Sequence, residues 1–262
     1  MSTETIIVER DAGVVTVTLN RPERKNAGNG LMWQELYDTL SDVGRRRQDR
    51  VVVVTGAGGA FCSGADIADP SGVSGEPNDP HIVRMRFFGR VMLALHELPK
   101  PTIAKIRGIA AGAGMSLALG CDLTVASDNA RFSEIFARRG LSVDGGSSWL
   151  LPRLVGLHKA KELAYFADIL SAREAAEYGL LNRVVADDEL DAFVEGWARR
   201  LAQAPPIALS MTKTLLDNAM SVTMAQALED EARCQTINFS SEDTAEAMRA
   251  FAEKREPKFK GS

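Results

Sequence analysis

The most constraining feature of this sequence is a run of four valines, residues 51–54, that leads directly into a glycine-rich turn. A continuous β-branched run predicts a strand buried on both faces, which is typical of a parallel sheet. A dinucleotide-binding fold also places a strand before GxGxxG. Here, however, Phe61 stands where that motif has its third glycine, at the point where helix and strand must pack closely. No acidic residue follows at the spacing needed to bind a ribose, so a different strand-turn-helix fold is favoured.

Hydrophobic periodicity alternates between period two and period 3.6 through the first half of the chain. The pattern predicts a hairpin followed by alternating helices and strands, over residues 6–10, 14–19, 31–44, 50–55, 81–97, 102–106, 115–119 and 122–126. Alternation of this kind favours an α/β fold with a buried, largely parallel sheet. Residues 69–80 are rich in Pro, Gly, Ser and Asp, which predicts a loop.

From Ser171 onward the sequence pattern is almost wholly helical. Ser171 and Glu174 have the spacing of a capping box, which marks the start of a helix. The prolines at positions 205 and 206 indicate a boundary. We therefore expect a core over residues 1–203 that holds the functional site, and a C-terminal helical region over residues 204–262.

Composition excludes several classes of protein. The net charge of −4 argues against a nucleic-acid or membrane-surface partner. The three cysteines lie far apart without a CxxC motif, and with only three histidines no metal site is expected. The N-terminus is polar rather than a signal peptide, and no apolar run reaches about 18 residues, so we expect a cytoplasmic protein without a membrane span.

Two small-residue turns suggest a chemical role. Ala65 follows the first glycine-rich turn, and Ala113 lies between Gly112 and Gly114 where a second helix begins. Two backbone N–H groups at such turns, one of them at a helix N-terminus, can hold a single oxyanion such as a thioester enolate. Close packing of strand against helix explains small residues equally well, so the turns alone leave both interpretations open.

Two longer segments, residues 56–67 (GAGGAFCSGADI) and 106–123 (IRGIAAGAGMSLALGCDL), resemble the signature segments of the crotonase superfamily, the enoyl-CoA hydratase/isomerase family. Further similar segments are found in the same order over residues 20–27, 150–156, 172–185 and 250–255. The pattern is closest to isomerase-type members with a single active-site aspartate. The resemblance implies an α/β fold, a spiral of ββα units with a C-terminal helical trimerisation region. It also implies a homotrimer or a dimer of trimers.

The resemblance further implies an acyl-CoA substrate and assigns residues to it. Ala65 and Ala113 would donate the two N–H groups of the oxyanion hole. The CoA-binding positions of the family match Arg24, Ala27, Ser63, Asp66, Ile67, Phe251 and Lys254. The last two lie in the tail and can serve a neighbouring subunit, although Lys254 alone is equally consistent with a solvated helix lysine. No separate cofactor is expected, because coenzyme A is part of the substrate.

The hydratases of this family use two glutamates to hold and activate water, and this sequence lacks both. Ser116 and Phe136 stand at the two positions. Glu134 lies two residues before Phe136 and would share its face in an extended segment, displaced by several ångströms. The sequence therefore speaks against efficient hydration.

Asp144, before Gly145 and Gly146, is the remaining acidic candidate. A lone carboxylate suits a double-bond isomerase, because one base can take a proton from C2 of a 3-enoyl thioester and return it at C4. Aspartate before two glycines is also a common turn or cap residue. Two other hypotheses stay open: a hydratase or another crotonase reaction that uses a rearranged carboxylate such as Glu134, and a non-catalytic acyl-CoA-binding protein.

The acyl pocket is expected to draw on aromatic and thioether side chains. Met85 and Phe88 fall on one helix face, where they line either the core or the pocket. Phe136 and Trp149 are plausible apolar neighbours of Asp144, and burial beside them would raise the pKa of its carboxyl group.

Overall fold

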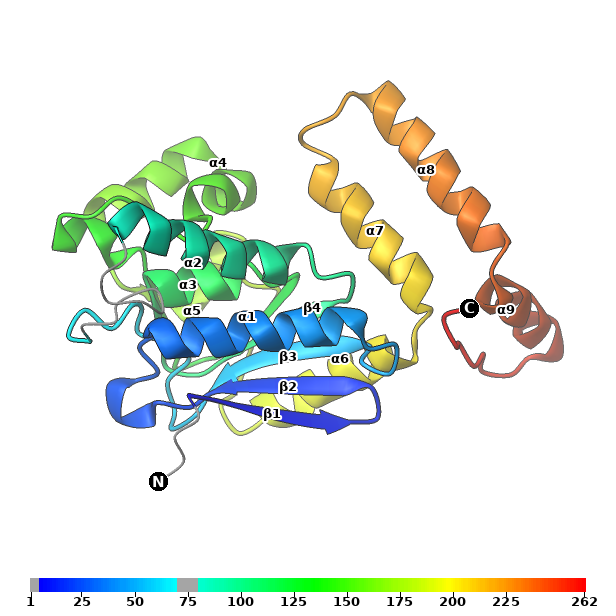
Figure 1. Cartoon of the computed structure of the whole chain (residues 1–262), viewed down its shortest axis with the longest axis horizontal. Helices are drawn as coiled ribbons and strands as arrows, with labels where there is room; N and C mark the ends of the chain where they lie inside the picture. The colour runs from blue at the N-terminus through cyan, green and yellow to red at the C-terminus, as the bar shows by residue number, and fades with distance from the viewer. Residues whose placement is uncertain (1–4, 70–79) are drawn as a thin grey trace.

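Figure 1 shows the computed structural model of the chain, which describes residues 5–69 and 80–262. Most of the loop predicted over residues 69–80 lies outside the described residues. The core is built on a six-stranded sheet with the strand order β1-β2-β3-β4-β6-β9. These strands are β1 (Ile6–Asp11), β2 (Val14–Leu19), β3 (Val51–Gly56), β4 (Thr102–Ile106), β6 (Leu123–Ser127) and β9 (Arg183–Val185).

The predicted hairpin pairs β1 with β2 in antiparallel register, with Asp11 opposite Val14. Every other neighbouring pair in this sheet is parallel. The four valines of β3 are buried, and their side chains alternate between two hydrophobic clusters. Val52 and Val54 join the main core, while Val51 and Val53 pack with the helix on the opposite face. The prediction of a strand buried on both faces is therefore confirmed.

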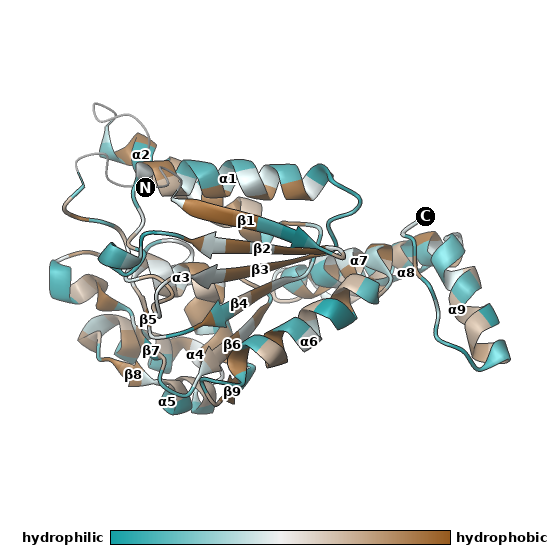
Figure 2. Ribbon diagram, turned by 90° about the horizontal axis from the view of Figure 1, so that it is seen from below, coloured by the Kyte–Doolittle hydropathy of each residue, from teal (hydrophilic) through white to brown (hydrophobic). Residues whose placement is uncertain are grey.

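Helices cover both faces of the sheet. Figure 2 shows α1 (Gly30–Arg45) on one side of the strands and α6 (Leu190–Gln203) on the other. α2 (His81–His96) packs beside α1. The apolar stripe of α1 faces the core with Met32, Trp33, Leu36 and Leu40, as the 3.6-residue spacing predicts. A layered α/β core results.

A second, smaller sheet has three strands in the order β5-β7-β8. Its strands are β5 (Ile109–Ala111), β7 (Arg131–Ser133) and β8 (Leu170–Ser171). The helical elements around it are η1 (Pro22–Arg24), α3 (Ala113–Leu119), η2 (Ile135–Arg139), α4 (Ser147–Phe166) and α5 (Ala172–Glu177). Ser171 caps α5 through the predicted capping box with Glu174. The short strand β9 interrupts the segment that the sequence predicts as helical.

The C-terminal helices extend away from the core, as Figure 1 shows: α7 (Pro206–Asn218), α8 (Met224–Phe239) and α9 (Glu242–Glu253). None of the residues of α7 or α8 is buried within the chain. α7 begins at Pro206, the second of the two prolines at which the sequence predicts a boundary. Among the described helices, none has the length and apolar character needed to cross a membrane.

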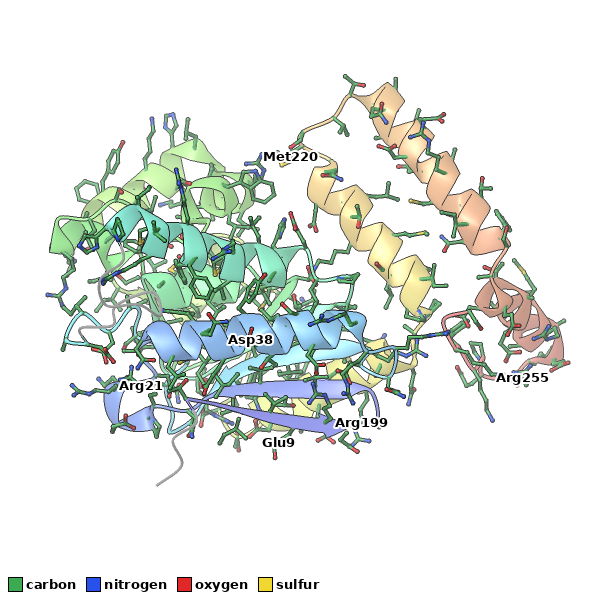
Figure 3. The ribbon with its side chains drawn as sticks, viewed as in Figure 1. Glu9, Arg21, Asp38, Arg199, Met220 and Arg255 are labelled. Carbon is green, nitrogen blue, oxygen red and sulfur yellow. The ribbon has the colours of Figure 1, made fainter. Side chains whose placement is uncertain are left out.

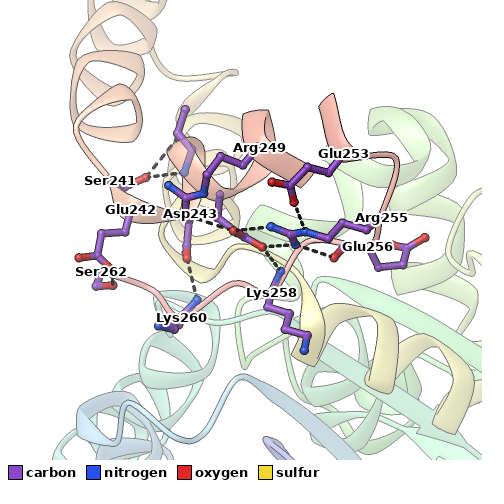
Figure 4. Close-up of polar contacts among 12 residues, drawn as sticks. Ser241, Glu242, Asp243, Arg249, Glu253, Arg255, Glu256, Lys258, Lys260 and Ser262 are labelled. Atoms are coloured by element: carbon purple, nitrogen blue, oxygen red, sulfur yellow. Dashed lines mark hydrogen bonds and ion pairs between the residues drawn. The ribbon is translucent and has the colours of Figure 1, made fainter. Parts of the chain in front are cut away.

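The final residues fold back along α9 (Figure 4). The buried carboxylate of Asp243 accepts hydrogen bonds from the backbone N–H groups of Lys260 (2.7 Å) and Gly261 (2.9 Å). Arg50 in turn donates to the carbonyl oxygen of Lys260 at 2.9 Å. The side chains of Arg47 and Arg50 thus both contact the backbone of the C-terminal tail.

Candidate active site

The first glycine-rich turn follows β3 and brings the backbone of Ala65 beside Gly28. The two residues form a parallel bridge, in which Gly28 N–H donates to the Gly64 carbonyl and Asp66 N–H donates to the Gly28 carbonyl, both at 2.8 Å. Gly64 has φ +109°, a conformation that L side chains rarely adopt. The amide of Ala65 lies between these two hydrogen bonds and donates none to another group of the described residues.

The second turn begins α3. Gly112 has φ +51° and ψ −126°, and its N–H donates to the Ser133 carbonyl at 2.9 Å. Ala113 is the first residue of the helix and is buried. Within the described chain its amide likewise donates no hydrogen bond, as expected for an N-terminal helical residue.

The two turns lie against each other. Cys62 bridges Ala110, with reciprocal backbone hydrogen bonds of 3.0 Å to the carbonyl of Ile109 and from the amide of Ala111. A Cβ atom at Gly64 would lie 3.0 Å from the Ala111 carbonyl oxygen and 3.9 Å from the Ala113 amide nitrogen. The geometry therefore brings together two amide-bearing turns of the kind that can share one oxyanion.

Asp144 lies in the segment that leads into α4. Its carbonyl oxygen accepts hydrogen bonds from the hydroxyl of Ser116 (3.1 Å) and from the backbone N–H of Ser147 (3.0 Å). Ser116 belongs to α3 and lies one turn after Ala113, about 4.5 Å along the helix axis. The backbone of Asp144 is thus fastened close to the turn that begins α3.

The side chain of Asp144 lines a cavity of about 840 Å³. Its Oδ1 atom is buried without a hydrogen-bond partner among the described residues. Burial raises the pKa of the Asp144 carboxyl to about 6, because it disfavours the charged form. A carboxyl group with a pKa near the working pH is suited to take up and return a proton.

The same cavity contains three of the four predicted acyl-pocket residues. Met85, Phe88 and Trp149 line it together with Met92, Leu93 and Leu150. Phe136 is buried elsewhere: a Cβ atom at Gly112 would lie 3.7 Å from its ring, so it packs under the second turn. The cavity is mainly apolar beside Asp144, as an acyl chain requires.

The predicted CoA-binding residues fall into two groups. Arg24, Ala27, Ser63, Asp66 and Ile67 surround the first turn; for example, the Ser63 hydroxyl donates to the Arg24 carbonyl at 3.2 Å. The Asp66 carboxylate is buried and pairs with Arg21 at 2.9 Å, so within the chain its side chain fastens the turn. Arg21 is labelled in Figure 3 at the edge of the core.

The other group, Phe251 and Lys254, lies at the end of α9. The Phe251 side chain is 86% exposed. Figure 1 shows α9 on the far side of α7 and α8 from the core. One chain therefore does not bring these two residues to the turns at Ala65 and Ala113.

Sequence reasoning missed Ser147 and misplaced Glu134. Residues 135–139 form the 3-10 helix η2 rather than an extended segment, so the argument that positions 134 and 136 share a face does not apply. Glu134 is buried and accepts a hydrogen bond from the Ser147 hydroxyl at 3.2 Å. Nothing in the spacing of these residues signals a contact across 13 positions of the chain, because it depends on how α4 packs on η2.

The cysteine thiols show no sign of activation. Cys62 and Cys121 are buried, and burial raises their pKa to about 11 and about 12, respectively. Both thiols therefore remain protonated near neutral pH, consistent with packing roles. The described residues include no group of three or more His, Cys, Asp or Glu side chains placed to hold a metal ion.

The chain is similar to known proteins of one family. Residues 9–262 match the family described as enoyl-CoA hydratase/isomerase. The chain is 38% identical to 1,2-epoxyphenylacetyl-CoA isomerase of Escherichia coli K12, over 98% of this chain and 99% of the relative. It is also 38% identical to a probable enoyl-CoA hydratase of Rhodobacter capsulatus, over the full length of both.

Solved structures agree with these relatives. An enoyl-CoA hydratase from Bacillus anthracis superposes with a TM-score of 0.93 at 32% identity, covering 99% of this chain and 100% of the other. A putative enoyl-CoA hydratase from Streptomyces coelicolor gives the same TM-score at 39% identity, covering 100% and 96%. The core is therefore a crotonase fold, while the names of the relatives include both isomerase and hydratase.

Proposed function

Because the chain belongs to the enoyl-CoA hydratase/isomerase family, we propose that it is an enoyl-CoA double-bond isomerase with Asp144 as its acid/base. One observation carries this proposal. Asp144 lines an apolar cavity, one oxygen of its carboxylate is buried without a hydrogen-bond partner among the described residues, and its backbone is fastened one helical turn from Ala113. Ser116 and Phe136, at the family's two glutamate positions, supply no carboxylate.

The proposed reaction moves one proton. The Asp144 carboxylate removes a proton from C2 of a 3-enoyl thioester, and the electron pair of the C2–H bond spreads to the thioester oxygen. The amides of Ala65 and Ala113 stabilise this dienolate by hydrogen bonding to that oxygen. Return of the proton from Asp144 to C4 converts the 3-ene to the 2-ene, so nothing is consumed or released. No separate cofactor enters these steps, because coenzyme A arrives as part of the substrate.

Hydration remains the second candidate, and Glu134 is the observation that favours it. The pKa of this carboxyl is raised to about 7, chiefly by burial and also by the nearby charge of Asp144, while the hydrogen bond from Ser147 acts in the opposite direction. Two neighbouring carboxyl groups could in principle activate water. Glu134, however, does not line the cavity as Asp144 does, so it lacks access to a bound acyl group in the described part of the chain.

The test is a parallel assay with 3-enoyl-CoA and 2-enoyl-CoA. We expect conversion of the 3-enoyl thioester without hydration of the 2-enoyl thioester, and loss of at least about a hundredfold in kcat for Asp144→Asn. The matched control is Asp168→Asn, an exposed aspartate paired with Arg138, which should keep wild-type rates. Undiminished isomerisation by Asp144→Asn would overturn the assignment, and hydration as the main activity would favour the second candidate.

A further inference from the structure

Behind the wall of the cavity, three oxygen atoms form a continuous chain that ends at Asp144. Glu134 Oε1 lies 3.2 Å from the Ser147 hydroxyl, which lies 2.9 Å from the Ser116 hydroxyl. The Ser116 hydroxyl in turn lies 3.1 Å from the carbonyl oxygen of Asp144. All three side chains are at most 1% exposed, so bulk water does not replace these contacts.

The number of protons decides the direction of this chain. Each serine hydroxyl has a single hydrogen to donate. If Glu134 is protonated, it donates to Ser147 and Ser147 donates to Ser116, so the Ser116 hydrogen is left for a backbone carbonyl, that of Asp144 at 3.1 Å or that of Gly112 at 3.2 Å. If Glu134 is ionised, Ser147 turns its hydrogen to Glu134, and the Ser147 oxygen, 2.9 Å away, becomes the nearest acceptor for the Ser116 hydrogen. The Asp144 carbonyl then loses one of its two donors and keeps only the Ser147 N–H.

We propose that Glu134 is a positioning residue whose proton sets the direction of the Glu134–Ser147–Ser116 relay and thereby fixes the backbone of Asp144. The proposal rests on the proposed function in one respect, namely that turnover depends on the orientation of the Asp144 carboxylate toward the substrate. The relay itself depends only on the hydrogen-bond geometry.

The surroundings favour positioning over direct catalysis by Glu134. A Cβ atom at Gly145 would lie 2.7 Å from Ser116 Cβ and 3.0 Å from the Phe88 ring, so the segment after Asp144 is tightly packed between α3 and α2. Glu134 lies behind this packing and outside the cavity lining. A small loss of anchoring at the Asp144 carbonyl would therefore move the one carboxylate that meets the substrate.

The charges around Glu134 favour its protonated form near neutrality. Burial is the main cause of its raised pKa, about 7, and the carboxylate of Asp144 is the charged group that adds to it. The hydrogen bond from Ser147 acts in the opposite direction. On η2, Arg138 is exposed and paired with Asp168, and Arg139 is exposed as well. Below about pH 7 the relay points to Asp144, and above it the relay reverses.

Infrared difference spectroscopy tests the relay without any substrate. The spectrum of the wild type minus that of Glu134→Gln should contain a protonated carboxylic acid band at pH 6, and that band should disappear at pH 9. Ser147→Ala should shift the band, because the acid loses its hydrogen-bond acceptor. Absence of the band at pH 6 would overturn the proposal, whatever the activity of Asp144 variants proves to be.

Kinetics test the consequence. Ser116→Ala and Glu134→Ala should each lower kcat about tenfold at pH 6.5 with KM changed less than about twofold, the effect expected from losing one hydrogen bond. Glutamine can donate as protonated glutamate does, so Glu134→Gln should recover most of the loss of Glu134→Ala. It should also abolish the fall of wild-type kcat to a lower plateau above pH 7. The control is Ser127→Ala, a fully buried serine bonded to Asn129 outside the relay.

Two kinetic results would contradict the relay. Equal loss in Glu134→Gln and Glu134→Ala would mean that Glu134 itself transfers a proton. A Ser116→Ala variant with the wild-type pH profile of kcat would mean that the hydroxyl chain does not couple the protonation of Glu134 to Asp144. If Asp144→Asn remains active while the infrared band behaves as expected, the proposed function fails but the relay stands.

Discussion

Gly64, whose peptide bond to the next residue carries the Ala65 N–H, has φ +109°. Residues other than glycine rarely adopt this conformation. A methyl group there would also press on the Ala111 carbonyl at 3.0 Å. Gly59 provides a matched position, since its φ is +80° and a Cβ atom would meet nothing within 4 Å.

We predict that Gly59→Ala lowers the free energy of unfolding by about 1–2 kcal/mol, the cost of a left-handed alanine. Gly64→Ala should lower it by more, because its methyl group also presses on the Ala111 carbonyl oxygen. Only Gly64→Ala should also lower kcat, by about a hundredfold, because displacement of the Ala65 amide weakens one oxyanion donor. Urea denaturation and steady-state kinetics measure the two effects. Equal kcat values in the two variants would show that this turn does not serve the reaction.

Glu134 makes stability depend on pH in a direction opposite to that of most acidic groups. Its pKa is about 7 in the folded chain against 4.5 for the free side chain, so the folded state holds the proton more tightly. Stability from this group is complete below about pH 4.5, falls as pH rises through 7, and stays low above it. We predict that Glu134→Gln gains up to roughly 3 kcal/mol relative to wild type between pH 4.5 and pH 8.

Chemical denaturation of both proteins at pH 5 and pH 8 measures this difference. The control is Glu231→Gln on α8, an exposed site that should show no such change. A Glu134→Gln variant that tracks wild type at both pH values would mean that the carboxyl is not held protonated in the folded chain.

At the residue scale, the sequence locates a turn where a position belongs to a local motif. The turns at Ala65 and Ala113 are recognisable because glycine and alanine permit close backbone approach. Ser147 escaped recognition, since its role depends on a contact with Glu134 that only the packing of α4 against η2 creates. Likewise, the sequence gives no sign that the Asp66 carboxylate is paired with Arg21.

At the scale of elements, the strands and long helices were predictable from periodicity. The bounds predicted for β2 and β4 agree with the structure, and the helix predicted at residues 31–44 is α1, Gly30–Arg45. Short elements were not predictable: three-residue strands such as β7 and β9 contain too few residues to show a period. The helix η2 was mistaken for an extended segment for the same reason.

The C-terminal tail behaves as an element held by one buried carboxylate. Because Asp243 accepts hydrogen bonds from two tail amides, we predict that Asp243→Ala costs about 1–3 kcal/mol locally and releases residues 257–262 from α9. Limited proteolysis should cut the variant near Lys258 or Lys260 at least about tenfold faster than wild type. Glu231→Ala, on exposed α8, is the control, and equal cleavage of all three proteins would contradict the prediction.

At the scale of the whole molecule, the C-terminal helices leave much apolar surface uncovered. Exposed apolar side chains on or just beyond α7 and α8 include Leu216, Met220, Met224, Leu228, Ile237 and Phe239. Figure 3 labels Met220 just beyond the end of α7. Large apolar side chains left exposed on neighbouring helices are typical of an interaction site. A second copy of this chain is the occupant we propose, in a homotrimer or a dimer of trimers, as the family resemblance implies.

We predict that wild type elutes as a trimer, three chains of 28.3 kDa or about 85 kDa, or as twice that mass, and that Met224→Asp/Leu228→Asp reduces the mass toward one chain. The two residues are one turn apart on α8, so two buried carboxylates would oppose assembly. Light scattering coupled to size-exclusion chromatography measures the mass, with Glu231→Gln as the control. A wild type of 28.3 kDa at micromolar concentration would contradict the prediction.

Loss of assembly should then affect KM for the acyl-CoA more than it affects kcat. Phe251 and Lys254 do not reach the turns at Ala65 and Ala113 of their own chain, so we expect them to contact the CoA bound by a neighbouring subunit. Asp144, Glu134 and both turns, by contrast, belong to one core. Dissociation by the α8 variant should therefore raise KM for the acyl-CoA several-fold, by roughly the 1–2 kcal/mol that a few contacts at the edge of an interface contribute, while kcat falls less.

If Lys254→Ala raises KM in the trimer but has no further effect in the dissociated variant, the tail lysine acts across the interface. An equal effect in both would place its contribution within a single chain.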